Sequence, residues 1–245
     1  MMKRLSPWLA ALLGGLVLPV CASGHVTVNS SDGGVTLLAD IGNLAQLLER
    51  SKVNDPQTMK IIAEKCSTVI VEKNYRHVLQ RLATWAVDEK GARSDTINMV
   101  LHQLMAVRVT GRQFVNLDLD WLNIHPEANY VLEGDYSLYL RKRDKTVTLM
   151  GAINGAGTLR WEPQRTVSTY LKGHNRLPGA DLNQVMLIDP DGKVRVAPTA
   201  YWNEHYMEAE PGSVIWVGFS SDSLPDKDPE LGRDIISVLR HRIPD

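Results

Sequence analysis

Residues 26–48 read VTVNSSDGGVTLLADIGNLAQLL, and residues 147–171 read VTLMGAINGAGTLRWEPQRTVSTYL. Each stretch begins with an alternating apolar segment, passes through a glycine-containing turn into a second such segment, and ends with apolar residues at helical spacing. This order predicts a β-hairpin followed by a helix in both places. Asp40 is the expected N-cap of the first helix and Thr166 that of the second.

A second pair of stretches extends the repeat. Residues 132–140, LEGDYSLYL, and residues 210–219, EPGSVIWVGF, each consist of an acidic residue, a glycine and an alternating strand. Between the two halves of the second unit, QVMLI and KVRVAP are predicted strands joined by the turn sequence DPDG. Two units of hairpin, helix and strands in tandem predict an α+β fold made of two β-grasp domains.

The region from about residue 55 to 106 has a different texture. It contains a single glycine, Gly91, and its apolar residues recur at helical spacing. We therefore expect a helical hairpin inserted in the first domain, with strands following at residues 106–110 (AVRVT) and 114–121 (FVNLDLDW). The expected boundaries are 23–143 for the first β-grasp domain, 144–224 for the second, and 225–245 for a C-terminal amphipathic helix.

The C-terminal segment has apolar residues on one helical face between about Asp228 and Arg242. Such a helix either docks on the second domain or assembles into a membrane pore. Its length is about four turns, or roughly 22 Å at the helical rise per residue. Because a hydrocarbon core is about 30 Å thick, docking is the favoured interpretation.

The first 22 residues have the pattern of a secretory signal peptide. Lys3 and Arg4 precede an apolar run that ends at Val20, and small residues surround Ala22. The alternative, a lipoprotein signal with lipidated Cys21, is disfavoured by Val20 before the cysteine. We expect cleavage after Ala22, a periplasmic protein, and no transmembrane span afterwards. Cys66 would then be the single cysteine, and its apolar neighbours predict a buried thiol.

Composition and motifs argue against several classes of function. Removing Lys3 and Arg4 from the 27 basic residues leaves 25 against 28 acidic residues, which is unlike a nucleic-acid-binding protein. The sequence has no G-x-S-x-G element and no H-x-x-x-H pattern. Asp118 and Asp120 would share one face of a predicted strand, which suits a metal ion less well than a solvent-facing surface. We expect no catalytic residue, no metal and no cofactor.

Several of these stretches together resemble one protein family. VTLMGAINGAGTLRW, TVSTYL, LPGADLNQVMLIDPDGKVRVAP and the ending PGSVIWVGFSSDSLP…IISVLRHRIPD are similar to the GfcC family of capsule-biosynthesis proteins, as are VRVTGRQFVNLDLDW and LEGDYSLYL. The resemblance implies two tandem β-grasp domains, a helical hairpin in the first and an amphipathic C-terminal helix. It also implies similarity to the periplasmic domains of Wza-type polysaccharide exporters. Members of the family are encoded together with capsule or exopolysaccharide genes.

One residue in the best-matching part is a candidate for ligand binding. Arg112 follows Gly111, which we interpret as a kink between two strands, and should emerge beside the helical hairpin. Its guanidinium could offer a fork of donors to a carboxylate or to sugar hydroxyls, or it could form a structural ion pair. Among the tryptophans, Trp216 is expected in sheet packing and Trp202, next to Tyr201, near a surface.

These observations predict a non-enzymatic periplasmic accessory protein in capsule or exopolysaccharide assembly or export. It would bind the polysaccharide or a polysaccharide-export protein, and we expect a monomer. Two alternatives stay open: a polysaccharide-modifying enzyme, and an oligomeric component of an outer-membrane export channel.

Overall fold

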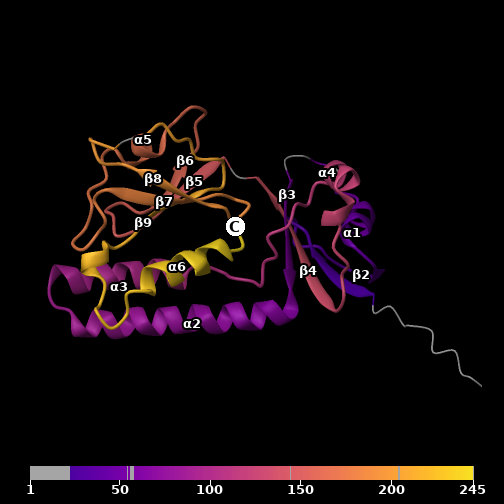
Figure 1. Cartoon of the computed structure of the whole chain (residues 1–245), viewed down its shortest axis with the longest axis horizontal. Coiled ribbons are helices and arrows are strands. Elements are labelled where there is room, and N and C mark those ends of the chain that lie inside the picture. Colours follow the sequence, from indigo (N-terminus) through magenta and orange to yellow (C-terminus); the bar gives the residue numbers. More distant parts are fainter. Residues whose placement is uncertain (1–22, 54, 56–57, 144, 204, 245) are drawn as a thin grey trace, which may run out of the picture.

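The computed structural model describes residues 23–53, 55, 58–143, 145–203 and 205–244, so the predicted signal peptide lies outside the described part. The described chain is an α+β protein with two sheets and six α-helices. The sheets occupy two lobes, with the first sheet on the right and the second on the left of Figure 1.

The first sheet has the strand order β2-β1-β4-β3. Its elements are β1 (Gly24–Asn29), β2 (Val35–Ile41), β3 (Thr58–Glu64) and β4 (Asp135–Lys142), with helix α1 (Leu44–Ser51) after the β1–β2 hairpin. Strand β1 pairs antiparallel with β2 and parallel with β4, and β3 pairs antiparallel with β4.

The second sheet has the order β6-β5-β9-β7-β8. Its elements are β5 (Thr146–Gly151), β6 (Gly157–Arg160), β7 (Gln184–Ile188), β8 (Val194–Pro198) and β9 (Val214–Val217), with helix α5 (Val167–Leu171) after the β5–β6 hairpin. Strand β5 pairs antiparallel with β6 and parallel with β9, and β7 pairs antiparallel with both β8 and β9.

Four strands of the second sheet, in the order β6-β5-β9-β7, therefore repeat the connectivity of the first sheet, and β8 is an additional strand at the edge. This is the repeat that the sequence indicates. In each, a hairpin leads into a helix, and the first strand of the hairpin pairs parallel with the strand taken from the acid-glycine stretch. The side chain of Thr166 caps α5 by accepting from the Thr169 amide, as expected. The expected cap Asp40 is wrong, because Asp40 lies in β2 and Asn43 accepts from the Gln46 amide at the start of α1.

Two long helices stand between β3 and β4 in the chain. They are α2 (Lys65–Asp88) and α3 (Ala92–Met105), and they pack against each other. The expectation that helical structure begins near residue 55 is wrong, because residues 58–64 form β3 at the edge of the first sheet. Apolar spacing did not reveal this, since Ile61 and Ile62 are buried in a strand while Val69 and Ile70 are exposed on a helix.

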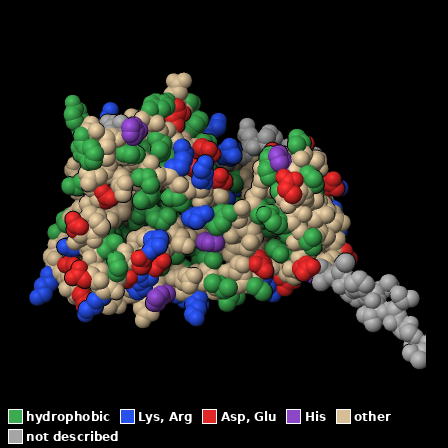
Figure 2. All heavy atoms as spheres, in the orientation of Figure 1, with side chains coloured by type: hydrophobic (Ala, Val, Ile, Leu, Met, Phe, Trp, Pro, Cys, Tyr) green, Lys and Arg blue, Asp and Glu red, His purple; other side chains and the backbone are tan. Residues whose placement is uncertain are grey.

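Helices α2 and α3 lie beneath the second sheet, although the chain inserts them between strands of the first (Figure 1). Their buried residues Leu82, Trp85, Ile97 and Leu104 belong to the same hydrophobic core as the strands of the second sheet. The first sheet has a separate core, built with α1 and Leu122. The lobe of the second sheet is accordingly the larger one in the space-filling view (Figure 2).

The segment that follows α3 departs from expectation. Residues 106–110 and 114–121 do not form strands of either sheet. Residues of this segment make only isolated bridges, such as Val109 to Arg242. Residues 119–124 form a short helix, α4 (Leu119–Ile124), because the Asp118 side chain accepts from the Trp121 amide and starts a helical turn. A one-turn 3-10 helix, Pro126–Ala128, leads on towards β4.

The last helix, α6 (Leu231–Arg240), is shorter than the expected helix from about Asp228 to Arg242, but it docks as predicted. Its residues Leu231, Ile235, Val238 and Leu239 are buried in the second core. A second 3-10 turn, Ser221–Ser223, precedes it. Within the described residues, no helix is long and apolar enough to cross a membrane.

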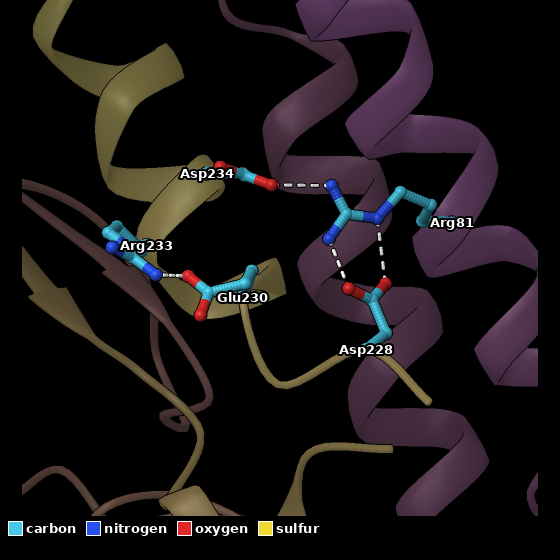
Figure 3. Close-up of polar contacts among 5 residues, drawn as sticks. All are labelled: Arg81, Asp228, Glu230, Arg233 and Asp234. Atoms are coloured by element: carbon cyan, nitrogen blue, oxygen red, sulfur yellow. Dashed lines mark hydrogen bonds and ion pairs between the residues drawn. The ribbon is translucent and has the colours of Figure 1, made fainter. Parts of the chain in front are cut away.

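An arginine on α2 ties the last helix in place. Arg81 donates to both carboxylate oxygens of Asp228, with Nε at 2.7 Å from Oδ2, and to Asp234 Oδ2 at 2.6 Å (Figure 3). These contacts raise the pKa of Arg81 further above its ordinary value, chiefly through the hydrogen bond to Asp228. Because Asp228 and Asp234 flank the start of α6, one side chain joins the first half of the chain to its end.

Candidate functional site

A cleft of about 1060 Å³ opens where the two lobes meet. One wall comes from β3 and the segment 112–120, and the other from the β7–β8 turn and the end of α6. Its basic lining residues are Lys60, Arg112, Arg143, Lys193 and Arg240. Carboxylates lie among them, and Figure 2 shows both charge types gathered at the junction of the lobes.

Backbone contacts fix the position of Arg112 in the wall. Gly111 and Gln113 flank it and bond to β3: the Glu64 amide donates to the Gly111 carbonyl, and the Gln113 amide donates to the Ile62 carbonyl. Gly111 is pressed against the start of α2, where a Cβ would lie 2.2 Å from the Thr68 nitrogen. Glycine is needed here for close approach to α2, and not for the kink between two strands that we expected.

The Arg112 side chain reaches across to the second sheet. It is 6% exposed, and its Nη2 donates to the Pro190 carbonyl oxygen at 2.7 Å. Its Nη1 is buried without a hydrogen-bond partner among the described residues. Burial lowers the pKa of Arg112 to about 10; nearby Asp191 opposes this decrease and Arg240 adds to it. The cleft therefore holds a guanidinium with one unused donor nitrogen.

A second arginine contacts the same turn from α6. Arg240 Nε donates to the Gly192 carbonyl oxygen at 2.9 Å, and its guanidinium lies 4.4 Å from the centre of the Phe114 ring. Phe114 also lies 5.7 Å from the Arg112 guanidinium and packs edge-on to His241. Burial lowers the pKa of His241, and Arg240 and Arg112 add to the decrease. The turn 189–193 is thus held from both the first half and the end of the chain.

The turn itself is braced from within the second lobe. Asp189 is almost fully buried and accepts from Arg195 Nε and Nη2, both at 2.7 Å. Arg242 is 6% exposed and donates from Nη2 to the Gly212 carbonyl oxygen at 2.6 Å. Burial lowers the pKa of Arg242 to about 10; Arg112 adds to the decrease and Asp189 opposes it. These supports hold the carbonyls of the turn in a fixed position facing Arg112 and Arg240.

The contacts of Arg112 bear on one of the two interpretations that we considered, the structural ion pair. Within the described residues, its guanidinium makes no ion pair, and its protein partner is a backbone carbonyl. Arg112 lines the cleft, and its partnerless Nη1 is buried, so a carboxylate or a sugar hydroxyl would reach this nitrogen only if the side chain moved. Sequence reasoning placed Arg112 beside the hairpin but missed Pro190 and Arg240, which lie far along the chain and carry no local signal.

The other residues that the sequence singled out lie elsewhere or play other roles. Asp118 and Asp120 line the cleft but do not share a strand face, since Asp118 caps α4 and Asp120 sits in its first turn. In the described residues, no group of three or more His, Cys, Asp or Glu side chains is arranged to hold a metal ion. Trp216 is 2% exposed and Trp202 is 76% exposed, as predicted.

The prediction for Cys66 is wrong. Its side chain is exposed, because the apolar run in which it lies changes from a buried strand to a helix at Glu64. Cys66 occupies the first turn of α2, where neighbouring apolar residues face solvent. The apolar residues next to Cys66 in the sequence therefore do not place it in a hydrophobic core.

The fold and cleft define a class of protein with two connected α+β lobes and an arginine-bearing cleft between them. Residues 22–143 match the family "Capsule biosynthesis GfcC, N-terminal", and residues 155–244 match "Capsule biosynthesis GfcC C-terminal". The chain belongs to the GfcC family.

Two curated proteins are similar to the chain in part. It is 35% identical over 184 residues to "Uncharacterized protein YjbG" of Escherichia coli (strain K12), which covers 75% of each protein. A stretch of 99 residues is 30% identical to "Ribosomal protein uS12 methylthiotransferase RimO" of Synechococcus sp. (strain WH7803), covering 40% of this chain and 20% of that protein. The second match spans too little of either protein to indicate a shared function.

Proposed function

We propose that this protein is a non-enzymatic periplasmic accessory protein in capsule or exopolysaccharide assembly or export. It binds the polysaccharide, or an export protein, in the cleft that holds Arg112. Membership of a capsule-biosynthesis family supports the process, and the half-used guanidinium of Arg112 is the observation that carries the site.

The proposal includes a finer assignment of the fold. Each sheet is a β-grasp unit, since a hairpin is followed by a helix and the first hairpin strand runs parallel to a central partner. Helices α2 and α3 form a helical hairpin inserted in the first unit. In this assignment the two units resemble the periplasmic domains of Wza-type exporters. The protein acts as a monomer, with the apolar face of α6 docked in its own core.

The choice of ligand follows from the chemistry of the cleft. Sugar hydroxyls and uronic-acid carboxylates accept hydrogen bonds in the geometry that a guanidinium offers. Lys193 and Arg240 on the opposite wall add positive charge, while the carboxylates of the lining accept from sugar hydroxyls. A cleft with both charge types suits a polyhydroxylated chain better than a simple anion.

The test is complementation of a strain that lacks the gene. Arg112→Lys keeps the charge but loses the fork, so we expect impaired polysaccharide production with a melting temperature near that of the wild type. Arg76→Lys, at an exposed position of α2, is the matched control and should complement fully. Normal polymer output from stable Arg112→Lys and Arg112→Ala variants would show that the cleft is not the site.

A second measurement separates binding from catalysis. The purified protein is incubated with the polysaccharide of the source strain, and chain length and substituents are followed by size-exclusion chromatography and NMR. We expect no change in either. Shortened or altered polymer, absent with Arg112→Lys, would establish the modifying-enzyme alternative instead.

A further inference from the structure

A turn at the far end of β8 presents aromatic side chains to solvent. Tyr201 is fully exposed and Trp202 is 76% exposed, and Leu182 on the adjacent turn is 66% exposed. Large aromatic side chains are usually buried, so two in succession at a tip are informative. Within the described residues, neither the Tyr201 hydroxyl nor the Trp202 indole N–H has a hydrogen-bond partner.

Hydrogen bonds hold this turn in one shape. The Asn203 amide donates to the Ala200 carbonyl at 3.0 Å, and the Ala200 amide donates to Asn203 Oδ1 at 2.9 Å. The Asn183 carbonyl accepts from the amides of Thr199 and Ala200, which attaches the turn to the start of β7. Tyr201 and Trp202 occupy the two central positions, so their backbone is already ordered before any ligand arrives.

A cation lies next to the turn. Arg176 Nη2 donates to Thr199 Oγ1 at 3.0 Å, while its Nη1 is buried without a partner among the described residues. Burial lowers the pKa of Arg176, and nearby Asp181 opposes the decrease. The turn thus combines two aromatic faces with a nearby donor group.

We propose that the turn Ala200–Asn203 is a second polysaccharide contact, in which Tyr201 and Trp202 stack on sugar rings beside the positive charge of Arg176. This inference rests on the proposed function and names a separate place on the chain. Sugar rings have apolar C–H faces and hydroxyl edges, which match aromatic faces bordered by polar groups. Tyrosine and tryptophan provide this contact area with few rotatable bonds, so little side-chain freedom is lost.

The turn and the cleft are independent in space. The Pro190 carbonyl that contacts Arg112 precedes β8, and the turn Ala200–Asn203 follows it. The five residues of β8 lie between Pro190 and the turn, and they span about 16 Å at the rise of a β-strand. Substitutions at two sites this far apart have additive effects on stability, so each site can be tested without disturbing the other.

The test is calorimetric titration of the full chain with oligosaccharides prepared from the exopolysaccharide of the source strain. We expect Trp202→Ala to weaken binding about tenfold and Tyr201→Ala to weaken it less, because tryptophan is the commoner source of large losses at binding sites. Tyr130→Ala, an exposed aromatic on the first lobe, is the matched control and should bind like the wild type. Melting temperatures should not change, since these side chains are exposed.

Each other outcome decides the matter. If Trp202→Ala binds like the wild type while Arg112→Lys binds weakly, the aromatic contact is wrong and the proposed function stands. If the wild type binds no oligosaccharide, both the aromatic contact and the polysaccharide form of the proposed function fail. If the wild type binds vesicles of phosphatidylcholine and phosphatidylglycerol but no oligosaccharide, and Trp202→Ala abolishes this, the turn is a lipid contact.

Discussion

The second sheet repeats the four-strand connectivity of the first and adds β8, but the two sheets are covered in different ways. The first is covered by α1 and Leu122 of α4, which lie close to it in sequence. The second is covered by α2 and α3, which come from between the strands of the first, and by α6 at the end of the chain. Two sheets with a common order of four strands can therefore be covered by helices from quite different parts of the chain.

The hydrophobic cores divide the chain differently from the family matches. The family matches divide the chain at residues 143 and 155, so that α2 and α3 fall in the N-terminal match. Packing places the same helices in the core of the C-terminal sheet. The family boundaries and the hydrophobic cores thus assign about forty residues, α2 and α3, to different halves of the chain. Experiments can show which of the two divisions describes the units that unfold cooperatively.

The largest expected effect comes from cutting the chain between the sheets. The fragment 144–245 keeps all five strands of its sheet but loses α2 and α3, so the buried faces of β5 and α6 become exposed. We expect no cooperative thermal unfolding of this fragment, measured by near-ultraviolet circular dichroism. Mixing it with fragment 23–143 should restore the transition, because that fragment carries both helices. A cooperative transition in fragment 144–245 alone would show that the second sheet does not need α2 and α3 to fold.

A pair of core substitutions gives the next largest effect. Leu82 on α2 and Leu47 on α1 are both 0% exposed, and replacing either with alanine should cost about 2–5 kcal/mol of unfolding free energy. The two should differ in location: Leu82→Ala lowers hydrogen-exchange protection in β5 and β9, and Leu47→Ala lowers it in β1 and β4. Loss of protection in the first sheet from Leu82→Ala would show that α2 serves both cores equally.

Breaking the contact between α2 and α6 should have a smaller effect. Arg81→Met keeps most of the apolar stem and removes the hydrogen bonds to Asp228 and Asp234. Partly exposed charged hydrogen bonds of this kind contribute about 1–2 kcal/mol, measured as a lower urea midpoint. Arg76→Met, on an exposed part of the same helix, is the control. An unchanged midpoint for Arg81→Met would mean that apolar burial alone holds α6.

The smallest effect is a dependence on pH at the junction of the lobes. Burial lowers the pKa of His241 below its ordinary value of 6.5, so the unfolded chain binds more protons than the folded chain below that pH. The contribution of His241 to stability is therefore present above pH 6.5 and is lost as the pH falls towards the folded pKa. His241→Asn should reduce the difference in melting temperature between pH 7.5 and 5.5, and the exposed His77→Asn should not.

The repeat was predictable from sequence because its signals are local. Alternation, glycine turns and the Thr166 cap each involve residues within a few positions of one another. Residues 58–64 were assigned to a helix because a short apolar run is compatible with either structure. Residues 114–121 alternate like a strand, yet Asp118 caps a helix, and a cap depends on backbone direction that the alternation does not reveal.

The candidate site was predictable only in part. Arg112 was identified within the segment that best resembles the family, but its hydrogen-bond partner Pro190 lies 78 positions away and its charged neighbour Arg240 lies 128 positions away. Periodicity indicates which side of an element is apolar and not what covers it, so the packing of α2 and α3 on the second sheet had no sequence signal. For the same reason Cys66 was predicted to be buried.

The position of α6 also sets an order for folding as the chain emerges from its N-terminus. The second core needs α2 from early in the chain, strands from the middle, and Leu239 near its end. It cannot close until almost the whole polypeptide has emerged, whereas the first core is complete once β4 has appeared at residue 142. Contacts of such wide sequence separation form slowly. The core of the larger lobe is therefore incomplete until the end of the chain has emerged, and the apolar faces of its strands are not fully covered until α6 is present.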